Sequence, residues 1–314
     1  STAPLDAATL KQVPAMVGTN EKRCTYPAFF TGPNKELIFM YRDGQSGNGS
    51  QIYNVYDLKA QTWKRLLDKP LTDGQGKMNA YFDGPVRGAD GWFHLCWVWR
   101  NSPACESNHD LSYARSKDLL HWERSDGKPF ELPITIQQCE IVDPVPPKGG
   151  IINGNTRLGF DNSGRVMISY HKYDAAGNTQ LYNARLEDGA WKSYQSSDWN
   201  YRWEFSGGGT IQGEIRVGAV QVVDGALIQS YGHEKLGGGA WRLDPQTLKP
   251  IGEHRGAAKR PAKLNKLEST FPGMSVRWSE DKGASGDDEI HYAMRWETLP
   301  SNRDRARPAP LPEP

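Results

Sequence analysis

The amino-acid sequence predicts an all-β protein with the architecture of a β-propeller. One pattern, an apolar strand followed by a turn or loop and a second strand, occurs five times along the chain. Gly and Pro, 33 and 21 residues, are spread among short apolar runs, as expected for many strands joined by turns. Helical periodicity is nearly absent. The 11 Trp and 13 Tyr are typical of strands packed between sheets, and such residues also serve as platforms for sugars.

Each of the five units begins with an apolar strand that ends in polar or charged residues. In chain order these strands are "ELIFMYRDG" (36–44), "WFHLCWVWR" (92–100), "RVMISYHKYD" (165–174), "ALIQSYGHE" (226–234) and "PGMSVRWSE" (272–280). The second strands lie within 51–66, 111–125, 179–194, 239–253 and 289–300. Their aromatic markers, 60, 69, 59 and 51 residues apart, are Tyr53, Tyr113, Tyr182, Trp241 and Tyr292. This spacing suits propeller blades with long loops, and a turn that ends in Trp recurs in "KAQTW", "SKDLLHW" and "LEDGAW".

The pattern predicts a single β-propeller domain over residues 1–300, followed by a tail. Residues 301–314, "SNRDRARPAPLPEP", are rich in Pro and in mixed charge, so we expect them to be extended or disordered. Near the start, "DAATLKQV" (6–13) predicts one short helix with Asp6 as its N-cap.

Composition excludes a general attraction to nucleic acid or membranes. The formal net charge is +1 with 24% charged residues, and no apolar run approaches the ~20 residues of a membrane helix. No charged-then-apolar leader opens the chain, which predicts the mature form of a secreted or periplasmic protein. The four Cys leave two alternatives, one bridge between Cys105 and Cys139 or free thiols; Cys96, inside an apolar run, is expected to be free.

Several long stretches carry a resemblance to a known family. They are "TYPAFFTGPNKELIFMYRDGQSGNGSQIYNVYD", "CESNHDLSYARSKDLLHWE", "GGIINGNTRLGFD", "SYHKYDAAGNTQLYNAR", "SDWNYRWEFSGGGTI" and "EIRVG". Over about residues 21–255 the chain resembles the BNR-repeat-containing carbohydrate-active proteins, a propeller family that includes ulvan lyases and rhamnose-glucuronate lyases and hydrolases. The resemblance implies seven blades, of which about five are visible, so about two N-terminal blades are expected in a separate segment. A five-bladed enzyme is the alternative, because "SKDLLHW" also resembles a turn in five-bladed glycosidases.

The resemblance implies a polysaccharide lyase that acts on an acidic polysaccharide or oligosaccharide, such as ulvan or a rhamnosyl-glucuronate glycan. Lyases of this kind remove the proton alpha to a uronic acid carboxylate and then expel the glycosidic oxygen. That β-elimination needs a base, an acid for the leaving oxygen, and a cation or strong donor that neutralises the carboxylate. His, Tyr and Arg side chains are suited to these roles.

His109 is the candidate base. It lies at the entrance of a strand in which Leu111 and Tyr113 alternate with polar residues, so its side chain can face solvent. An imidazole with a pKa near ~6.5 is partly neutral at working pH, and Asp110 or Asn108 can fix its tautomer. In the ulvan lyases that the chain resembles, a histidine in the matching stretch has this role. The structural alternative is a histidine that caps its own loop.

"SYHKYD" (169–174) places His171 and Tyr173 on one face at the end of a strand. Tyr173 is the candidate acid, and His171 is a candidate catalytic residue that assists it or binds the carboxylate. The alternative for Tyr173 is packing between blades. Arg185 in "YNAR" is the fourth catalytic candidate, because a guanidinium binds a carboxylate through two parallel hydrogen bonds; a structural ion pair is its alternative.

Six further residues are candidates for substrate binding, and most lie near predicted strand ends. They are Arg216, Tyr231, His233, Asn153, Asn155 and Arg42. Tyr231 and His233 repeat the spacing of "SYHKYD" in the next unit, whereas the two Asn residues are equally compatible with a turn. Because Arg42, Arg100 and Arg216 all fall near strand ends, several arginines can line one basic mouth.

The sequence predicts no required cofactor, and its metal content is unknown. No HExxH, CxxC or EF-hand pattern is present, although a structural Ca²⁺ or Zn²⁺ on scattered ligands stays compatible with the sequence. Two alternatives to the lyase remain at this point. One is a rhamnosidase-type glycoside hydrolase, for which no carboxylate pair stands in a recognisable motif. The other is a carbohydrate-binding propeller without catalysis.

Overall fold

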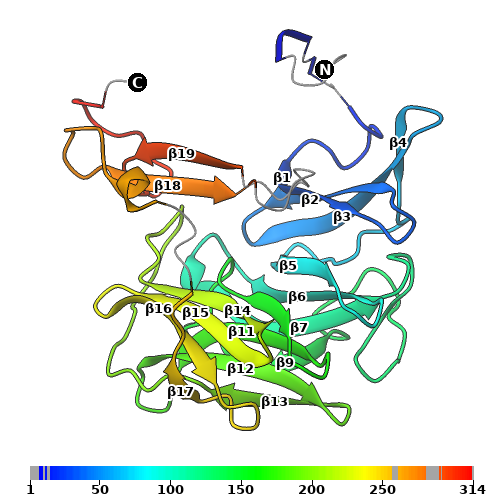
Figure 1. The fold of residues 1–314 in the computed structure, drawn as a ribbon. Helices are drawn as coiled ribbons and strands as arrows, with labels where there is room; N and C mark the ends of the chain where they lie inside the picture. Colours follow the sequence, from blue (N-terminus) through cyan, green and yellow to red (C-terminus); the bar gives the residue numbers. More distant parts are fainter. Residues whose placement is uncertain are drawn as a thin grey trace.

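The computed structural model describes residues 7–9, 11–12, 15–256, 261–280, 290 and 292–312, and these form antiparallel sheets almost throughout (Figure 1). The described strands make four sheets of the meander type and one hairpin. The three short 3-10 helices are η1 (Ala7–Thr9), η2 (Cys105–Ser107) and η3 (Ala262–Asn265). The all-β propeller fold that the sequence predicts is confirmed. Part of the predicted N-terminal helix, including its Asp6 cap, lies outside the described residues.

The four sheets follow one another in chain order. The first contains β1 (Cys24–Thr31), β2 (Leu37–Gln45), β3 (Asn48–Asp57) and β4 (Thr62–Arg65). The second contains β5 (Asn79–Arg87), β6 (Phe93–Arg100), β7 (Asn108–Ser116) and β8 (Trp122–Glu123), with β9 (Glu140–Asp143) also paired to β7. The third contains β10 (Arg157–Phe160), β11 (Val166–Tyr173), β12 (Thr179–Glu187) and β13 (Ala190–Gln195). The fourth contains β14 (Ile215–Val223), β15 (Ala226–His233), β16 (Gly237–Leu243) and β17 (Pro250–Glu253), and the hairpin is β18 (Ser275–Glu280) with β19 (Ala293–Thr298).

The five predicted strand pairs are the second and third strands of the four sheets and the final hairpin. Each pair is antiparallel, for example β6 with β7 and β11 with β12. The recurrent Trp residues lie on the fourth strands, as Trp63, Trp122 and Trp191. The first strand of each sheet has no clear strand pattern in the sequence and was not predicted, since β5 ("NAYFDGPVR") contains Gly-Pro and β10 has only four residues.

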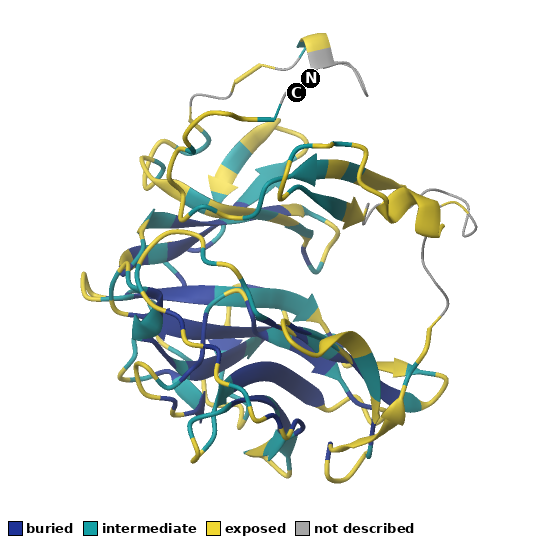
Figure 2. Cartoon of the chain, turned by 90° about the vertical axis from the view of Figure 1, so that its left-hand side faces the viewer, coloured by how far each residue is buried: buried dark blue, intermediate teal, exposed yellow. Residues whose placement is uncertain are grey.

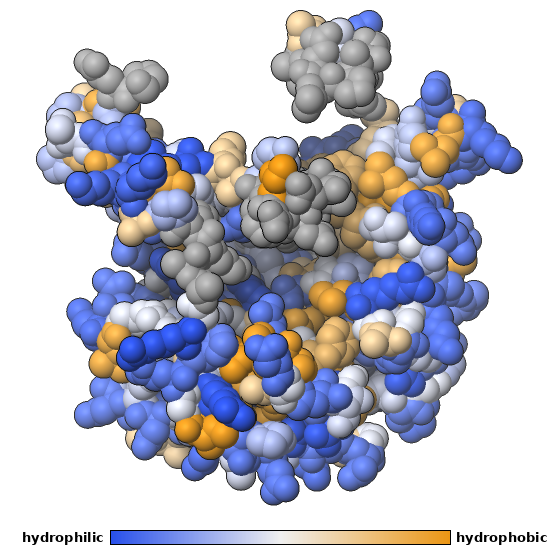
Figure 3. All heavy atoms as spheres, viewed as in Figure 1, coloured by the Kyte–Doolittle hydropathy of each residue, from blue (hydrophilic) through white to orange (hydrophobic). Residues whose placement is uncertain are grey.

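Neighbouring sheets pack face to face, and β6 shows how the sequence encodes this. Every residue of β6 is buried, because successive side chains point to opposite faces and both faces are covered. Trp97 and Trp99 pack against the first sheet, whereas Cys96 and Val98 pack toward the third. Figure 2 shows this dense burial in the middle sheets, in contrast to the exposed hairpin. On the outer side of the first sheet, Phe29 is exposed, and Figure 3 shows hydrophobic atoms on that side.

Side chains also join the first strands of neighbouring sheets. Asp83 of β5 accepts a hydrogen bond from the Leu158 backbone N–H of β10 (2.7 Å). Asn155, just before β10, uses both ends of its amide on β14: it donates to the Ile215 carbonyl (3.0 Å) and accepts from the Val217 N–H (3.0 Å). At Gly159 a Cβ would collide with the Val220 carbonyl, so only glycine allows this close approach.

Two further expectations can be compared with the structure. Cys105 and Cys139 are free thiols, as are Cys24 and Cys96, so the alternative of a Cys105–Cys139 bridge is wrong. The sequence predicts an extended or disordered tail after residue 300, whereas in the structure residues 302–305 form a turn that contacts the body of the protein. Within the described residues, no helix is long and apolar enough to cross a membrane.

Candidate functional site

The antiparallel topology places most of the predicted site residues at the same ends of the strands, on one side of the successive sheets. In each meander the start of the first strand faces the end of the second, as in the pairs Asn79–Arg100 and Ile215–His233. We call this side the rim. The candidate residues on the rim or in the loops beside it are Arg42, His109, Asn153, Asn155, His171, Tyr173, Arg216, Tyr231 and His233.

A cavity of about 250 Å³ opens where the first and second sheets meet, and we call it the Tyr81 cavity. Its lining residues are Tyr26, Pro27, Ala28, Met40, Arg42, Gln51, Ala80, Tyr81, Phe82, Asn153 and Gly154. It therefore brings together two predicted residues, Arg42 and Asn153, from segments more than a hundred residues apart in the chain.

Tyr81, near the start of β5, lies between two guanidinium groups. The Arg42 and Arg100 Cζ atoms lie 5.1 Å and 5.6 Å from the centre of its ring, and its hydroxyl is 2.8 Å from Ser46 Oγ. Burial alone would raise the pKa of Tyr81, but the Ser46 hydrogen bond and the charges of Arg42 and Arg100 outweigh it and hold the pKa below the usual 10. The surroundings therefore favour the phenolate more than water does for an ordinary tyrosine.

Arg42 is a buried residue in the wall of the Tyr81 cavity. Its side chain is 5% exposed, and its Nε donates to Thr25 Oγ1 (2.9 Å). Its Nη1 is buried and has no hydrogen-bond partner among the described residues. The Arg42 side chain instead acts on the Tyr81 phenol, through hydrogen bonding and through its charge, and both effects lower the pKa of Tyr81.

Arg100, in contrast, is fully engaged by the protein. Its Nε donates to the Ser102 carbonyl (3.0 Å), its Nη1 to Asn153 Oδ1 (3.1 Å), and its Nη2 to the Pro103 carbonyl. Asn153 Oδ1 also accepts from Asn108 Nδ2 (3.1 Å). Arg100 therefore acts as a fixed positive charge beside Tyr81, and Asn153 links it to the strand that carries His109.

His109 is 6% exposed and is held at both ring nitrogens. Nδ1 lies 2.8 Å from Asp110 Oδ2, and Nε2 lies 2.8 Å from Asn101 Oδ1. Asp110 and Asn101 together fix the orientation of the ring, and both ring nitrogens are occupied by protein partners.

Tyr173 lines a separate cavity of about 230 Å³, the Tyr173 cavity. The lining residues are Glu106, Lys148, Gly150, Tyr173, Glu204, Phe205 and Ser206. Burial raises the pKa of Tyr173 to about 12, even though the Arg202 guanidinium stacks 3.7 Å from the centre of its ring. The hydroxyl donates to the Trp203 carbonyl (2.8 Å). The phenol is thus held in its neutral form.

His171 is sealed inside the third sheet. It is 0% exposed, its ring packs 5.2 Å from that of Trp203, and neither ring nitrogen has a hydrogen-bond partner in the described part of the chain. Burial lowers the pKa of His171 to about 4, opposed only weakly by the nearby Gly150 backbone. This environment suits a neutral packing residue and leaves no path to a substrate.

Arg185 and Asn155 have structural partners. Arg185 Nε lies 2.6 Å from Glu187 Oε1, and its Nη1 and Nη2 donate to the carbonyls of Pro245 (2.6 Å) and Gln246 (3.2 Å). It is 3% exposed, and it lies six residues along β12 from the rim, about 20 Å at 3.3 Å per residue. Asn155 is occupied by β14, as described above. We therefore place neither residue in the proposed site.

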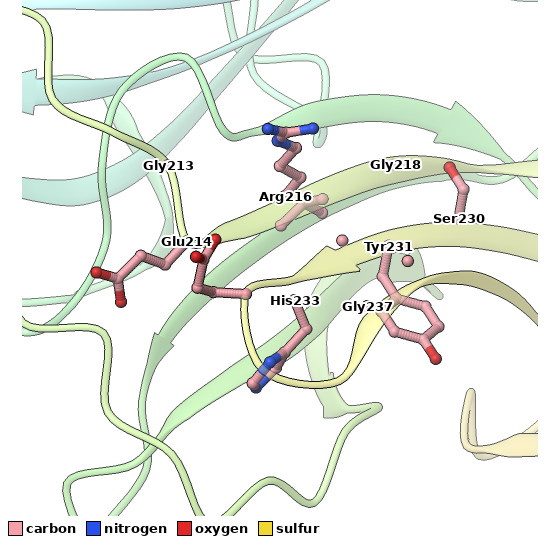
Figure 4. A pocket seen from close by; sticks show the side chains of 12 residues that line it. Gly213, Glu214, Arg216, Gly218, Ser230, Tyr231, His233 and Gly237 are labelled. Atoms are coloured by element: carbon pink, nitrogen blue, oxygen red, sulfur yellow. The ribbon is translucent and has the colours of Figure 1, made fainter. Parts of the chain in front are cut away.

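Arg216, Tyr231 and His233 line a third cavity, of about 430 Å³, on the fourth sheet (Figure 4). Arg216 extends to one side of the sheet and Tyr231 and His233 to the other, because Arg216 faces Gly232 while Ile215 faces His233. His233 Nδ1 accepts from the Lys235 N–H (3.1 Å), and burial lowers the pKa of the imidazole. Tyr231 stacks on Trp241 with ring centres 4.1 Å apart.

The predicted residues thus divide among three cavities instead of meeting in one. Arg42 and Asn153 share the Tyr81 cavity, Tyr173 lines the second cavity, and Arg216 lines the third. Sequence reasoning missed Tyr81, because "NAYFDG" matches no motif. The available signal was that Arg42 lies near the end of one second strand and Arg100 ends the next, and β5, which carries Tyr81, pairs with the strand of Arg100. Among the described residues, no three His, Cys, Asp or Glu side chains are grouped as metal ligands.

Curated proteins similar to this chain are ulvan lyases. The short-isoform ulvan lyase of Alteromonas sp. (strain LOR) is 27% identical over 135 residues, which is 40% of this chain and 26% of that protein. The long isoform of Glaciecola sp. (strain KUL10) is 40% identical over 48 residues, 15% of this chain and 5% of that protein. This chain therefore spans about a quarter, or less, of the length of these relatives.

Solved structures extend the likeness over most of the fold, and a family model identifies the chain. A PL25 ulvan lyase aligns with a TM-score of 0.55 at 12% identity and covers 74% of this chain and 55% of its own; the same figures hold for that enzyme bound to -[GlcA(1-4)Rha3S]-. The polysaccharide lyase Uly1 aligns with a TM-score of 0.50 at 17% identity, over 89% of this chain and 60% of its own. At these identities the likeness shows the fold. The model of the BNR repeat-containing family matches residues 1–199, and the protein belongs to that family.

Proposed function

We propose that this protein is a polysaccharide lyase that cleaves an acidic polysaccharide beside a uronic acid by β-elimination. The observation that carries the proposal is the Tyr81 phenol, held between Arg42 and Arg100 at the wall of a cavity. The ulvan lyases among the similar proteins support the same reaction class, and one of them binds an oligosaccharide that contains GlcA.

Arg42 supplies the carboxylate contact. The Arg42 guanidinium, which lines the Tyr81 cavity, offers a charge-assisted hydrogen bond to the uronate, and such bonds are about twice as strong as neutral ones. Neutralising the carboxylate lowers the energy of the carbanion-like transition state that forms when the alpha proton leaves. Arg100 adds a second positive charge whose position is fixed by its three hydrogen bonds.

Tyr81 transfers the proton. As phenolate it takes the alpha proton; the electron pair of that C–H bond then forms the C4=C5 double bond, and the C4–O glycosidic bond breaks. The leaving oxygen takes a proton from the Tyr81 phenol, so the side chain returns to its starting state. The lowered pKa of Tyr81 favours the first step, because the neighbouring guanidinium groups stabilise the negative charge of the phenolate. No cofactor enters this scheme.

His109 and Tyr173 keep secondary roles in the proposal. His109 lies beside Asn108, whose amide contacts Asn153 of the Tyr81 cavity, so we assign it to positioning. Tyr173 lines a second cavity, and the segment 148–154 contributes lining residues to both that cavity and the Tyr81 cavity. We assign the Tyr173 cavity to a neighbouring sugar of the same chain. A polymer of this kind does not cross membranes, so the proposal includes action outside the cytoplasm.

The test is incubation of the purified protein with ulvan. Formation of an unsaturated uronate is detected by its ultraviolet absorbance. Tyr81→Phe removes only the phenolic oxygen and keeps the ring on which the arginines stack. We expect this variant to lose at least about a hundredfold in kcat, since proton transfer by a positioned side chain contributes ~10²–10⁴-fold. Tyr173→Phe is expected to change KM more than kcat.

Tyr182→Phe is the control, because it also removes a tyrosine hydroxyl from a half-buried side chain, and the Tyr182 hydroxyl only donates to Gln195 Oε1 (3.1 Å), outside the three cavities. An unchanged kcat in Tyr81→Phe, or a larger loss in Tyr173→Phe or His109→Ala, would contradict the assignment of Tyr81. The same incubation separates the alternatives: a hydrolase releases reducing ends without ultraviolet absorbance, and a binding protein releases neither.

A further inference from the structure

The C-terminal segment is tied to a glycine-rich loop that borders the candidate site. This glycine loop, residues 206–210 ("SGGGT"), follows directly on Phe205 and contributes Ser206 to the Tyr173 cavity. The C-terminal turn, residues 302–305, is closed by a hydrogen bond from the Arg305 N–H to the Asn302 carbonyl (3.0 Å). The two segments meet although they lie almost a hundred residues apart in the chain.

The turn and the loop are joined by three hydrogen bonds. Arg303 Nη1 donates to the carbonyls of Ser206 (2.6 Å) and Gly208 (3.3 Å). Asp304 Oδ2 accepts from the Thr210 N–H (2.9 Å). A Cβ at Gly209 would collide with the backbone of Arg303, so the loop fits this turn only with glycine there.

The other side of the glycine loop contacts the turn that opens β7. The Gly207 carbonyl accepts from the Cys105 N–H (2.8 Å), and the Gly207 N–H donates to Glu106 Oε2 (2.8 Å). Glu106 is itself a lining residue of the Tyr173 cavity, and His109 follows three residues later. Backbone groups of the loop thus bond in alternation to the C-terminal turn and to residues 105–106. A loop with so few contacts of its own depends on these two partners for its conformation.

We propose that Arg303 and Asp304 are positioning residues, which hold the glycine loop against residues 105–106 and thereby shape the Tyr173 cavity for substrate. Neither side chain lines that cavity, so both act through the loop. The proposal deepens the proposed function, on which it rests for the assignment of the Tyr173 cavity as a sugar subsite.

Hydrogen exchange of the full-length protein, without substrate, tests the physical part of the proposal. In Arg303→Ala we expect the amides of residues 206–210 and of Cys105 to exchange about tenfold faster, because two hydrogen bonds to the loop are lost. Asp304→Ala should accelerate the Thr210 amide most. Arg305→Ala is the matched control, since it changes an exposed arginine of the same turn whose side chain makes no hydrogen bond within the described residues.

The lyase assay provides the functional readout. Arg303→Ala should raise KM about fivefold and leave kcat within about twofold, and Arg303→Lys, which keeps one donor, should recover part of the loss. If the amides of the glycine loop exchange equally fast in Arg303→Ala, Asp304→Ala and Arg305→Ala, then Arg303 and Asp304 do not hold the loop, whatever the activity of the variants. Faster loop exchange with an unchanged KM would overturn its link to the substrate. If the wild-type protein forms no unsaturated product, the proposed function fails, while the exchange result still decides whether the turn holds the loop.

Discussion

Replacement of His171 by Phe should remove a large part of the acid sensitivity of this protein. His171 is fully buried and its pKa is lowered to about 4, whereas an unfolded chain binds the proton with a pKa near 6.5. Between these values the unfolded state holds more protons than the folded state, so the free energy of unfolding falls as the pH falls. The contribution is fully present above about pH 6.5 and is lost progressively down to about pH 4.

The size of the effect follows from the pKa difference. At about 1.4 kcal/mol per unit, the shift corresponds to roughly 3 kcal/mol over the whole window, of which about 2.5 kcal/mol is lost at about pH 4.5. Phe packs in the same place beside Trp203 and Phe205. The interaction given up is the one with the Gly150 backbone, because the imidazole nitrogens have no partner at normal hydrogen-bond geometry within the described residues. Near neutral pH the variant should therefore stay within about 1.5 kcal/mol of the wild type.

Urea unfolding, followed by Trp fluorescence at about pH 7.5 and about pH 4.5, measures this difference. Other groups with shifted pKa values, such as His94 and Asp118, are present in both proteins and cancel in the comparison. The variant should gain about 2.5 kcal/mol relative to wild type on going to the lower pH. A gain below about 1 kcal/mol would mean that His171 is protonated or solvated in the folded protein, contrary to its burial.

Two further predictions concern Tyr81 and Arg185. If Tyr81 is the base, kcat/KM should rise with pH up to the pKa of Tyr81, which lies below 10. Ser46→Ala should shift this rise to higher pH, because the Ser46 hydrogen bond is among the interactions that lower the pKa of Tyr81. A pH–rate profile in which the rise does not shift refutes the assignment. Arg185→Met should destabilise the protein by roughly 2 kcal/mol in urea unfolding. It removes the donor to the Pro245 and Gln246 carbonyls and one of the two cations beside each of Glu187 and Asp161, which keep Lys192 and Arg165; wild-type stability would refute this structural role.

The fold was largely readable from the sequence because its signals are local. Strands buried on both faces, such as β6, are continuous apolar runs, and in three of the four sheets a Trp after a turn marks the fourth strand. The first strands were harder to recognise. They are stabilised by side-chain bonds to the next sheet, such as Asp83 to Leu158, and these contacts leave no periodic pattern in the sequence.

The site was less predictable because its chemistry depends on distant partners. His171 and Tyr173 do share a face at a strand end, but whether that end is open or sealed depends on Trp203 and Phe205, which arrive from a later loop. Arg42 was found from its place at a strand end, whereas the meaning of Tyr81 emerges only when Arg42 and Arg100 are seen on either side of it. The contact of the tail through Arg303 could not be anticipated either, since Pro-rich composition alone predicts the opposite.

The two-ended amide of Asn155 has a mechanical consequence. Because it donates to one residue of β14 and accepts from another two positions along, the third and fourth sheets cannot slide past each other along the strand direction without losing both bonds together. The Asn155 side chain therefore resists sliding of β14 along β10. It lies two residues from Asn153, which lines the Tyr81 cavity. A bulky replacement at Gly159 of the third sheet would press on the Val220 carbonyl of the fourth, and we expect it to strain the two Asn155 bonds to β14.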